Sequence, residues 1–385
     1  MRPIRLALAL ALLAAGCTGS TSEGSAPPSG GSPSATTIPT PSAEPTTTLA
    51  DGAPLPDGCT GTARTSQTVA FVAQGRAWAL DPRTGALACL FELGPAGPFA
   101  WGPQGDRVLL DGLEVRGVSG DAPDLPPIDA AATAFDWGHP IGLAIVFAQD
   151  TGKPEKRFVD DGSVERLHEL PGGDYLQIAY HPSGLALGFT LEDAEGESIW
   201  LSTNEGQDPS RLVFSKGSTS FTSIAFSPDG QRLWWIAQHA PGYPEIHWMD
   251  LSDRGGFTDT WRGLDGTTAD DLRLAPDGRL MSVNSGEECL ERQALVVAGR
   301  RASPALPDED RPTEAIGWLD RSTVLVAAGG CGEPVELYAA NVFDDQAAAL
   351  VSGVEIGATR TVVRHAPTEV PAPPDETEAP PGGVG

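Results

Sequence analysis

The sequence predicts an all-β fold made of repeated units of four short strands, and three features of the chain carry this prediction. An apolar run followed by an x-Pro-x-Gly turn recurs, and a second apolar run follows each turn. No long segment shows the 3.6-residue apolar period of an amphipathic helix. The turn prolines are spaced by 37 to 48 residues, which indicates a repeat architecture. They are Pro103, Pro140, Pro182, Pro228 and Pro276.

Each copy has the same internal order of elements. An apolar strand leads into the turn, where proline fixes φ and glycine accepts a positive φ. The clearest copy is IAFSPDG at 224–230, and the second strand, RLWWIA, follows it. A third strand and a weaker fourth strand complete the unit. Four short strands in about 40–45 residues are typical of one blade of a β-propeller.

Counting the units predicts a propeller of seven four-stranded blades, with six or eight as the alternatives. The segment 68–93 supplies three strands of a first blade that lacks its Pro-x-Gly strand, and a spare strand, TRTVVR, lies at 359–364. We expect the spare strand to complete the first blade, because closure of the ring removes exposed strand edges. The other units are predicted at 97–130, 133–172, 176–216, 222–262, 270–306 and 314–352, where Asp320 replaces the last proline.

The AFSPDG-type strand and turn resemble the WD40-like PD40 repeats of TolB-type propellers and of the propeller in prolyl-oligopeptidase relatives. The resemblance covers most of 65–365 and is strongest over 176–280. It implies blades around a water-filled channel that binds proteins or small ligands, and it implies no single activity. The oligopeptidases add an α/β-hydrolase domain. This chain has no room for such a domain and contains no G-x-S-x-G motif.

The first residues predict a lipoprotein signal peptide. Arg2 and Arg5 precede a short apolar run, and small residues follow it, which describes a secretory signal. The run is shorter than the roughly 20 residues that span a bilayer. The stretch LAAGC at 13–17 resembles the bacterial lipobox, and this resemblance implies cleavage after residue 16 and diacylation of Cys17. An ordinary signal peptide with a chance cysteine is the alternative.

Composition divides the chain into four parts. Residues 1–16 are the predicted signal peptide, and 17–57 are the lipidated cysteine with a Ser/Thr/Pro-rich tether. Residues 58–365 are the predicted propeller, and 366–385 are an acidic, Pro-rich tail. We expect the tether and the tail to be disordered, because their composition cannot bury enough apolar surface to offset the entropy of ordering.

The chain is strongly acidic, with 52 Asp and Glu against 25 Lys and Arg and a net charge of −27. Nucleic acid is therefore not an expected partner, because phosphate binding needs Lys/Arg patches. A well-solvated exported surface is the simplest interpretation, and a basic partner or a cation is the alternative. The residue usage resembles that of actinobacteria. We expect the protein outside the cytoplasm, on the outer face of the cytoplasmic membrane, held there by the lipid on Cys17.

Four cysteines remain after Cys17, and an even number in an exported chain predicts disulfides. In a propeller, Cys289 and Cys331 both follow the second strand of neighbouring blades, where equivalent loops lie side by side. This favours one bridge between them and a second between Cys59 and Cys89. Free thiols are the alternative. The spacing of the cysteines does not match a zinc knuckle.

Aromatic residues recur just before the proline position of most turns, and Leu274 takes this place before Pro276. We expect them to pack between blades, because large rings dominate such cores. A stacking platform for a ligand is the alternative. The residues are Trp101, Trp137, Tyr180, Phe226 and Trp318.

The segment WWIAQHAPGYPEIHWMD at 234–250 contains the candidate binding loop. The loop 238–244 can present Tyr243 and His239 as a recognition tip, since Tyr and Trp are favoured at binding hot spots. Consecutive strand residues face opposite sides, so one of Trp234 and Trp235 should be in the core. The six histidines form no constellation in the sequence, and no metal site is predicted. The candidate residues are Trp234, Trp235, His239, Tyr243, His247 and Trp248.

No catalytic motif is present, so no catalytic residue, no cofactor and no enzymatic activity are predicted. The favoured function is a membrane-anchored scaffold whose propeller binds an envelope protein or a small ligand. The first alternative is a propeller enzyme of the glycosidase, lyase or lactonase type, with carboxylates, histidines or a metal converging at a channel mouth. The second alternative is a structural envelope protein without a specific ligand.

Overall fold

The structure is a computed structural model, and all the residues that it describes lie in one compact unit, 45–385. The described residues are 59, 61–63, 67–92, 100–103, 105–110, 113–118, 124–128, 132–137, 144–149, 152–239, 243–252, 258–262, 264, 268–286, 291–307, 309–329, 335–344, 346–354 and 362–363. Cys17, the predicted tether and the predicted tail lie outside these ranges, so the expectations for them remain predictions.

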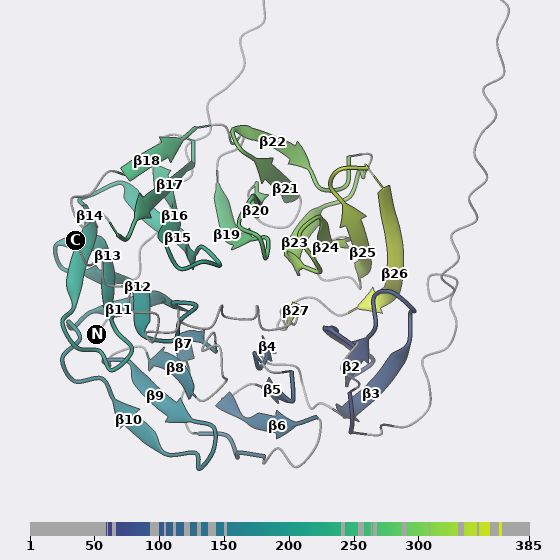
Figure 1. Cartoon of the computed structure of the whole chain (residues 1–385), viewed down its shortest axis with the longest axis horizontal. Coiled ribbons are helices and arrows are strands. Elements are labelled where there is room, and N and C mark those ends of the chain that lie inside the picture. Colours follow the sequence, from purple (N-terminus) through teal and green to yellow (C-terminus); the bar gives the residue numbers. More distant parts are fainter. Residues whose placement is uncertain are drawn as a thin grey trace, which may run out of the picture. The chain divides into compact units, whose positions relative to one another are not determined.

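Antiparallel sheets follow one another along the chain and form a ring (Figure 1). The first half of the described chain forms β1 (Val69–Ala73), β2 (Arg76–Leu80), β3 (Leu87–Glu92), β4 (Ala100–Trp101), β5 (Arg107–Leu109), β6 (Val115–Gly117), β7 (Ala132–Asp136), β8 (Ala144–Gln149), β9 (Glu155–Phe158), β10 (Val164–Arg166), β11 (Asp174–Tyr180), β12 (Ala186–Asp193), β13 (Gly196–Thr203) and β14 (Ser210–Ser215).

The second half forms β15 (Thr219–Phe226), β16 (Arg232–His239), β17 (Glu245–Asp250), β18 (Thr258–Trp261), β19 (Ala269–Leu274), β20 (Leu280–Ser285), β21 (Gln293–Ala298), β22 (Arg301–Pro304), β23 (Thr313–Trp318), β24 (Thr323–Ala328), β25 (Val335–Asn341), β26 (Gln346–Val354) and β27 (Val362–Val363). The described residues contain no α-helix, and accordingly no helix among them is long and apolar enough to span a bilayer.

The all-β propeller is confirmed, with six four-stranded sheets in the described chain, but the prediction of seven four-stranded blades is not met in full. The sheet β4-β5-β6 has three strands. Where a fourth strand would follow, Leu125 makes only an isolated bridge to Val115. Pro126 and Pro127 come next and lack the N–H groups that would extend this pairing, which explains why the described residues 124–128 form no fourth strand.

The ring closes by pairing the last strand with the first. Strand β27 pairs antiparallel with β1, Val69 opposite Val363 and Ala70 opposite Val362. The order of this sheet is β27-β1-β2-β3, so the C-terminal strand takes the place of the missing first strand of the blade. The expected role of the spare strand at 359–364 is thereby confirmed.

The repeated aromatic residues lie between blades, as predicted. Trp318 is fully buried, and its indole N–H donates to the carbonyl oxygen of Arg273 in the preceding blade, at 3.2 Å. The ring of Phe226 lies against Gly188, where a Cβ atom would be 3.1 Å from Cζ of the ring. Each such ring belongs to a cluster of buried residues that includes the preceding blade. These positions are therefore packing positions.

The Pro-x-Gly turns of neighbouring blades also touch one another. His181, in the turn after β11, contacts the turn after β15, with its Nε2 atom 2.8 Å from the carbonyl oxygen of Gly230. Gly230 has a φ of +69°, and a Cβ there would be 2.4 Å from the imidazole of His181. Glycine is thus required at position 230 for two reasons: it adopts the positive φ, and its lack of a Cβ leaves room for the imidazole of His181.

A disulfide joins Cys59 to Cys89 on β3, the pairing expected from the sequence. Cys289 and Cys331 lie outside the described residues, so their bridge stays a prediction.

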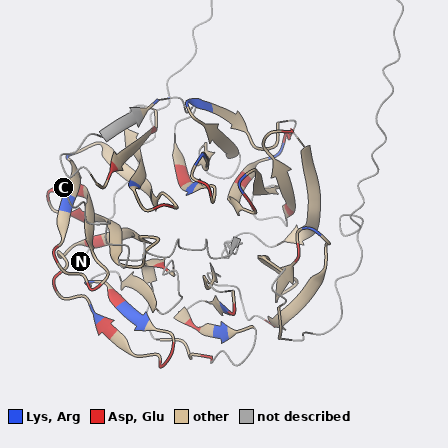
Figure 2. Ribbon diagram, viewed as in Figure 1, with Lys and Arg blue, Asp and Glu red and all other residues tan. Residues whose placement is uncertain are grey.

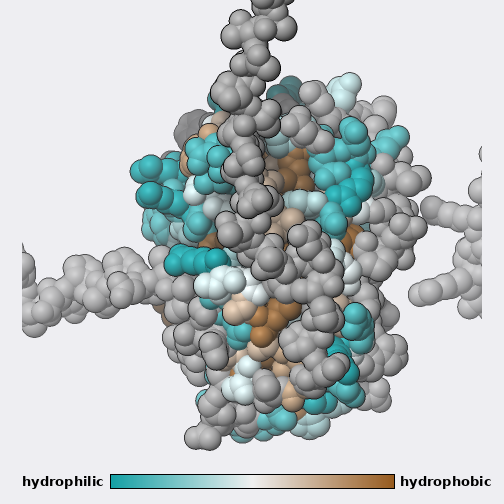
Figure 3. Space-filling model, turned by 90° about the vertical axis from the view of Figure 1, so that its right-hand side faces the viewer, coloured by the Kyte–Doolittle hydropathy of each residue, from teal (hydrophilic) through white to brown (hydrophobic). Residues whose placement is uncertain are grey.

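Acidic residues occupy many strand ends and turns around the ring, and basic residues are fewer (Figure 2). Hydrophilic and apolar residues are both visible on the side of the molecule shown in Figure 3. The large apolar side chains that are exposed in the described part of the chain lie on several different sheets and turns, which is ordinary for a folded surface.

Candidate functional site

The candidate site is at one end of the sheet β15–β18, where β16 ends and β17 begins. The two strands form a hairpin in which Ala237 is opposite Glu245 and Trp235 is opposite His247. Side chains two residues apart on a strand lie on the same face. The register therefore brings His239, Glu245 and His247 to one face of the hairpin end.

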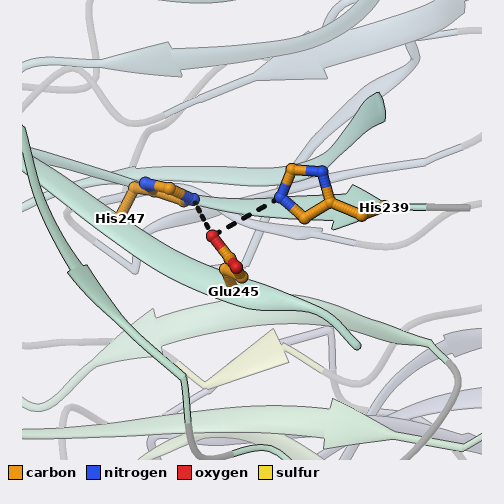
Figure 4. A group of neighbouring side chains, drawn as sticks. All are labelled: His239, Glu245 and His247. Atoms are coloured by element: carbon orange, nitrogen blue, oxygen red, sulfur yellow. Dashed lines mark ion pairs between the residues drawn. The ribbon is translucent and has the colours of Figure 1, made fainter. Parts of the chain in front are cut away.

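The carboxylate of Glu245 lies between the two imidazoles (Figure 4). Its Oε2 atom is 3.5 Å from Nε2 of His239 and 3.2 Å from Nε2 of His247. The three atoms that face one another all lie within 4.8 Å. We refer to His239, Glu245 and His247 as the His–Glu group.

Neighbouring side chains hold each member of the His–Glu group in place. Thr219, opposite His239 on β15, has its hydroxyl 3.0 Å from Nδ1 of His239. The ring of Trp235 stacks on His247, with centroids 5.4 Å apart and planes inclined by 6°. Arg262, which follows β18, has its Nε atom 2.5 Å from Oε1 of Glu245. Every member therefore has its orientation set from outside the group.

The local electrostatics favour a neutral imidazole at His247. Burial lowers the pKa of His247 below its ordinary value, and the Glu245 carboxylate acts in the opposite direction without cancelling this effect. Glu245 and His247 are largely buried, with 13% and 16% of their side chains exposed, whereas 39% of the His239 side chain is exposed. The group thus opens toward solvent on the His239 side.

The six candidate residues of the binding loop differ in how deeply they are buried. Trp234 and Trp235 are both buried and belong to two different core clusters, although only one of them was expected in the core. Trp248 is half-buried and stacks on Trp234, with ring centroids 4.8 Å apart. Tyr243 is the most exposed of the six, at 69%. The tryptophans therefore serve packing, and the more accessible of the described candidate residues are Tyr243 and His239.

The His–Glu group is not evident from the sequence, because residues 240–244 separate His239 from Glu245 along the chain. Glu245 was not among the candidate residues, and no metal site was predicted. The alternation E-x-H at 245–247 does place two of these side chains on one face of a strand. The position of His239, however, depends on the register of the hairpin and on the length of its loop.

A second charged cluster lies at the corresponding end of the next two blades. The guanidinium of Arg292 is 2.6 Å from Asp270 on β19 and 2.7 Å from Glu314 on β23. These ion pairs join two sheets, and we interpret them as structural.

A shallow hollow of about 340 Å³ occupies the opposite end of these blades. It lies among the turns after β19, β23 and β25 and contains none of the candidate residues. Its lining consists of Asp277, Arg279, Leu280, Arg321, Ser322 and Phe343. The hollow is distinct from the His–Glu group.

The structure resembles several solved structures at low sequence identity. A prolyl endopeptidase matches with a TM-score of 0.54 and 12% identity, over 75% of this chain and 50% of that chain. Oligogalacturonate lyase from Vibrio parahaemolyticus matches with a TM-score of 0.50 and 14% identity, over 70% and 84% of the two chains. TolB from Acinetobacter baumannii matches with a TM-score of 0.45 and 14% identity, over 79% and 67%. At these identities the likeness shows the fold alone.

No family model matches the sequence, and no curated protein matches it significantly.

Proposed function

We propose that this protein is an extracytoplasmic binding scaffold that is attached to the membrane by lipid on Cys17. In this proposal the segment 17–57 holds the propeller away from the bilayer, and the propeller binds an envelope protein or a small ligand. Its recognition surface is the end of the sheet β15–β18 that carries Tyr243 and the His–Glu group.

The observation that carries this proposal is the exposure of Tyr243 beside a fixed polar group. Tyr243 is 69% exposed, and Glu245, two residues later, forms an ion pair with Arg262 and lies 3.5 and 3.2 Å from the imidazoles of His239 and His247. An exposed tyrosine next to oriented polar groups suits a binding hot spot, because the ring supplies contact area and has few rotatable bonds to order.

The charge of the chain supports a partner with a basic contact surface. The net charge of −27 produces a negative potential, which steers basic partners and weakens as salt concentration rises. Arg262 adds a cation beside the site, with 77% of its side chain exposed. The site is thus a mixed-charge patch on an acidic protein.

The test is a pulldown from native membranes with the full chain as bait, at low and at high salt. The wild type is compared with Tyr243→Ala and with the control Phe343→Ala, which removes an aromatic ring of equal exposure, 69%, from the turn after β25. We expect one defined protein to be retained by the wild type and by Phe343→Ala but not by Tyr243→Ala. Equal retention by all three proteins would show that the recognition surface lies elsewhere on the propeller. If the wild type retains no protein at low or at high salt, the result would count against a protein partner.

An enzyme is the second candidate, and the His–Glu group is the observation that favours it. Two imidazoles and a carboxylate that converge on one point can act in proton transfer or in metal-assisted chemistry. The test is turnover of glycoside, polyuronate and lactone substrates by the wild type and by His247→Ala. Turnover that disappears in the variant would favour the enzyme, whereas absence of turnover in the wild type would favour the scaffold.

A further inference from the structure

We propose that His239, Glu245 and His247 form a binding site for a divalent metal ion of the zinc type, with at least one coordination position open. This inference goes beyond the binding function proposed above and does not depend on it. The ligand atoms are Nε2 of His239, Oε2 of Glu245 and Nε2 of His247.

Two of the three distances between these atoms match the edges of a metal coordination polyhedron. Zinc binds imidazole nitrogen and carboxylate oxygen at about 2.0–2.2 Å, so ligand atoms at the corners of a tetrahedron lie about 3.3–3.5 Å apart. The two distances from Oε2 of Glu245 are 3.5 Å to His239 and 3.2 Å to His247. All three ligand atoms lie within 4.8 Å of one another, so a metal ion can bind where the side chains converge after small adjustments of the imidazoles.

The surrounding contacts leave the three ligand atoms directed at that point. When Nδ1 of His239 donates to the hydroxyl of Thr219, 3.0 Å away, Nε2 carries the lone pair that a metal requires. This Nε2 atom is buried and forms no well-aligned hydrogen bond among the described residues, and it faces the carboxylate of Glu245 at 3.5 Å. A polar atom in such a position is costly to bury, and a metal ion would satisfy it.

The two carboxylate oxygens of Glu245 have different partners. Oε1 is held by Arg262, and Oε2 faces the two imidazoles. Such outer partners orient metal-binding carboxylates. The side chain of Arg262 is 77% exposed, so solvent screens its charge and the repulsion that it exerts on a bound cation is reduced.

The chemistry of the ligands favours zinc over magnesium and calcium. Imidazole suits zinc, copper, nickel and iron, whereas magnesium and calcium prefer oxygen ligands. Three protein ligands of the His₂Glu type leave a position for water or another small ligand, which distinguishes open sites from closed structural ones. We therefore expect an exchangeable ion at this site.

The test is zinc binding by the untagged full chain after treatment with a chelator and dialysis. Isothermal titration with ZnCl₂ is compared among the wild type, His239→Ala, His247→Ala, Glu245→Gln and Thr219→Val. His168→Ala is the control, because His168 is an exposed histidine of a different blade. Circular dichroism and the melting temperature in the presence of the chelator establish that each variant is folded. Glu245→Gln preserves the size of the side chain and is the variant least prone to misfold.

We expect the wild type and His168→Ala to bind one zinc ion and to gain thermal stability from it. Each ligand substitution should weaken binding at least tenfold, and Thr219→Val should weaken it by roughly 10-fold or more through loss of the outer hydrogen bond. The proposal is overturned if the wild type binds no zinc at micromolar concentrations, which would leave a hydrogen-bonded cluster without metal. It is also overturned if the folded ligand variants bind zinc as tightly as the wild type.

Discussion

Val69 in the first strand is paired with Val363 in the last, and this pairing closes the ring of sheets. Two residues of β27 occupy the inner position of a blade whose other three strands come from the opposite end of the described chain. The stability of the whole propeller should therefore depend on a short C-terminal segment.

Deletion of residues 355–385 should lower the free energy of unfolding by about 2 kcal/mol, because it removes the backbone pairing of β27 and exposes an edge of β1. Deletion of 366–385 alone is the matched control and should leave stability unchanged. Urea unfolding followed by tryptophan fluorescence measures both. Equal stability of the two truncated proteins would show that β27 contributes nothing to closure.

Gly230→Ala should destabilise the protein by about 3 kcal/mol, because it combines an unfavourable φ with a clash against His181 in the neighbouring turn. Gly299→Ala is the control, since Gly299 has a similar φ of +62° but a Cβ added there would meet no atom within 4 Å. It should cost only about 1 kcal/mol. Thermal and urea unfolding of the two variants provide the comparison, and equal losses would show that the contact between turns is unimportant.

Asp136 on β7 should make stability depend on pH. Burial raises its pKa to about 6, and backbone N–H groups of Tyr180 and Trp137, which donate to its carboxylate, oppose this shift. Between about pH 4 and pH 6 the folded protein holds a proton that the unfolded chain has released, so the contribution of Asp136 to stability decreases as pH rises.

Asp136→Asn should remove this contribution. Between pH 4 and pH 7, the wild type should lose on the order of 2 kcal/mol more unfolding free energy than Asp136→Asn does. Asp174→Asn, at an exposed carboxylate, is the control. Parallel pH profiles for the wild type and Asp136→Asn would refute the assignment.

The ion pair between Lys156 and Glu205 joins two neighbouring blades at a buried ammonium group. Nζ of Lys156 is 3.0 Å from Glu205, and only 4% of the Lys156 side chain is exposed. Glu205→Gln should cost about 1–3 kcal/mol, because it leaves this buried charge without its anion. Glu155→Gln, which breaks the more exposed pair with Arg166, should cost less than about 1 kcal/mol. Urea unfolding compares the two, and an equal cost would contradict the role assigned to burial.

Much of the fold was predictable because the local pattern repeats. The spacing of Pro182, Pro228 and Pro276 and the apolar runs beside them predicted the blades, and the unpaired strand at 359–364 predicted closure. The three-stranded form of the sheet β4-β5-β6 was less predictable, because the described residues beyond β6 offer a single bridge followed by Pro126 and Pro127. In the sequence, the unit 97–130 is shorter than the others and its outer strands are not clearly defined.

The candidate site was predictable only in part. The loop with Tyr243 was visible as a Pro/Gly-containing connection between aromatic-rich strands, but the roles of its tryptophans and the participation of Glu245 were not. Which side chains meet across a hairpin depends on its register, and a shift of one residue would direct Glu245 and His247 to the other face.

The all-β class and the repeat follow from the sequence, because strand alternation and Pro-x-Gly turns act over a few neighbouring residues, and the spare strand at 359–364 indicates closure of the ring. The convergence of His239 and His247 on Glu245, and the burial of both Trp234 and Trp235, are visible only in the folded chain. The reason is physical: these relationships depend on distances between strands and between blades, and the packing of the whole ring establishes those distances.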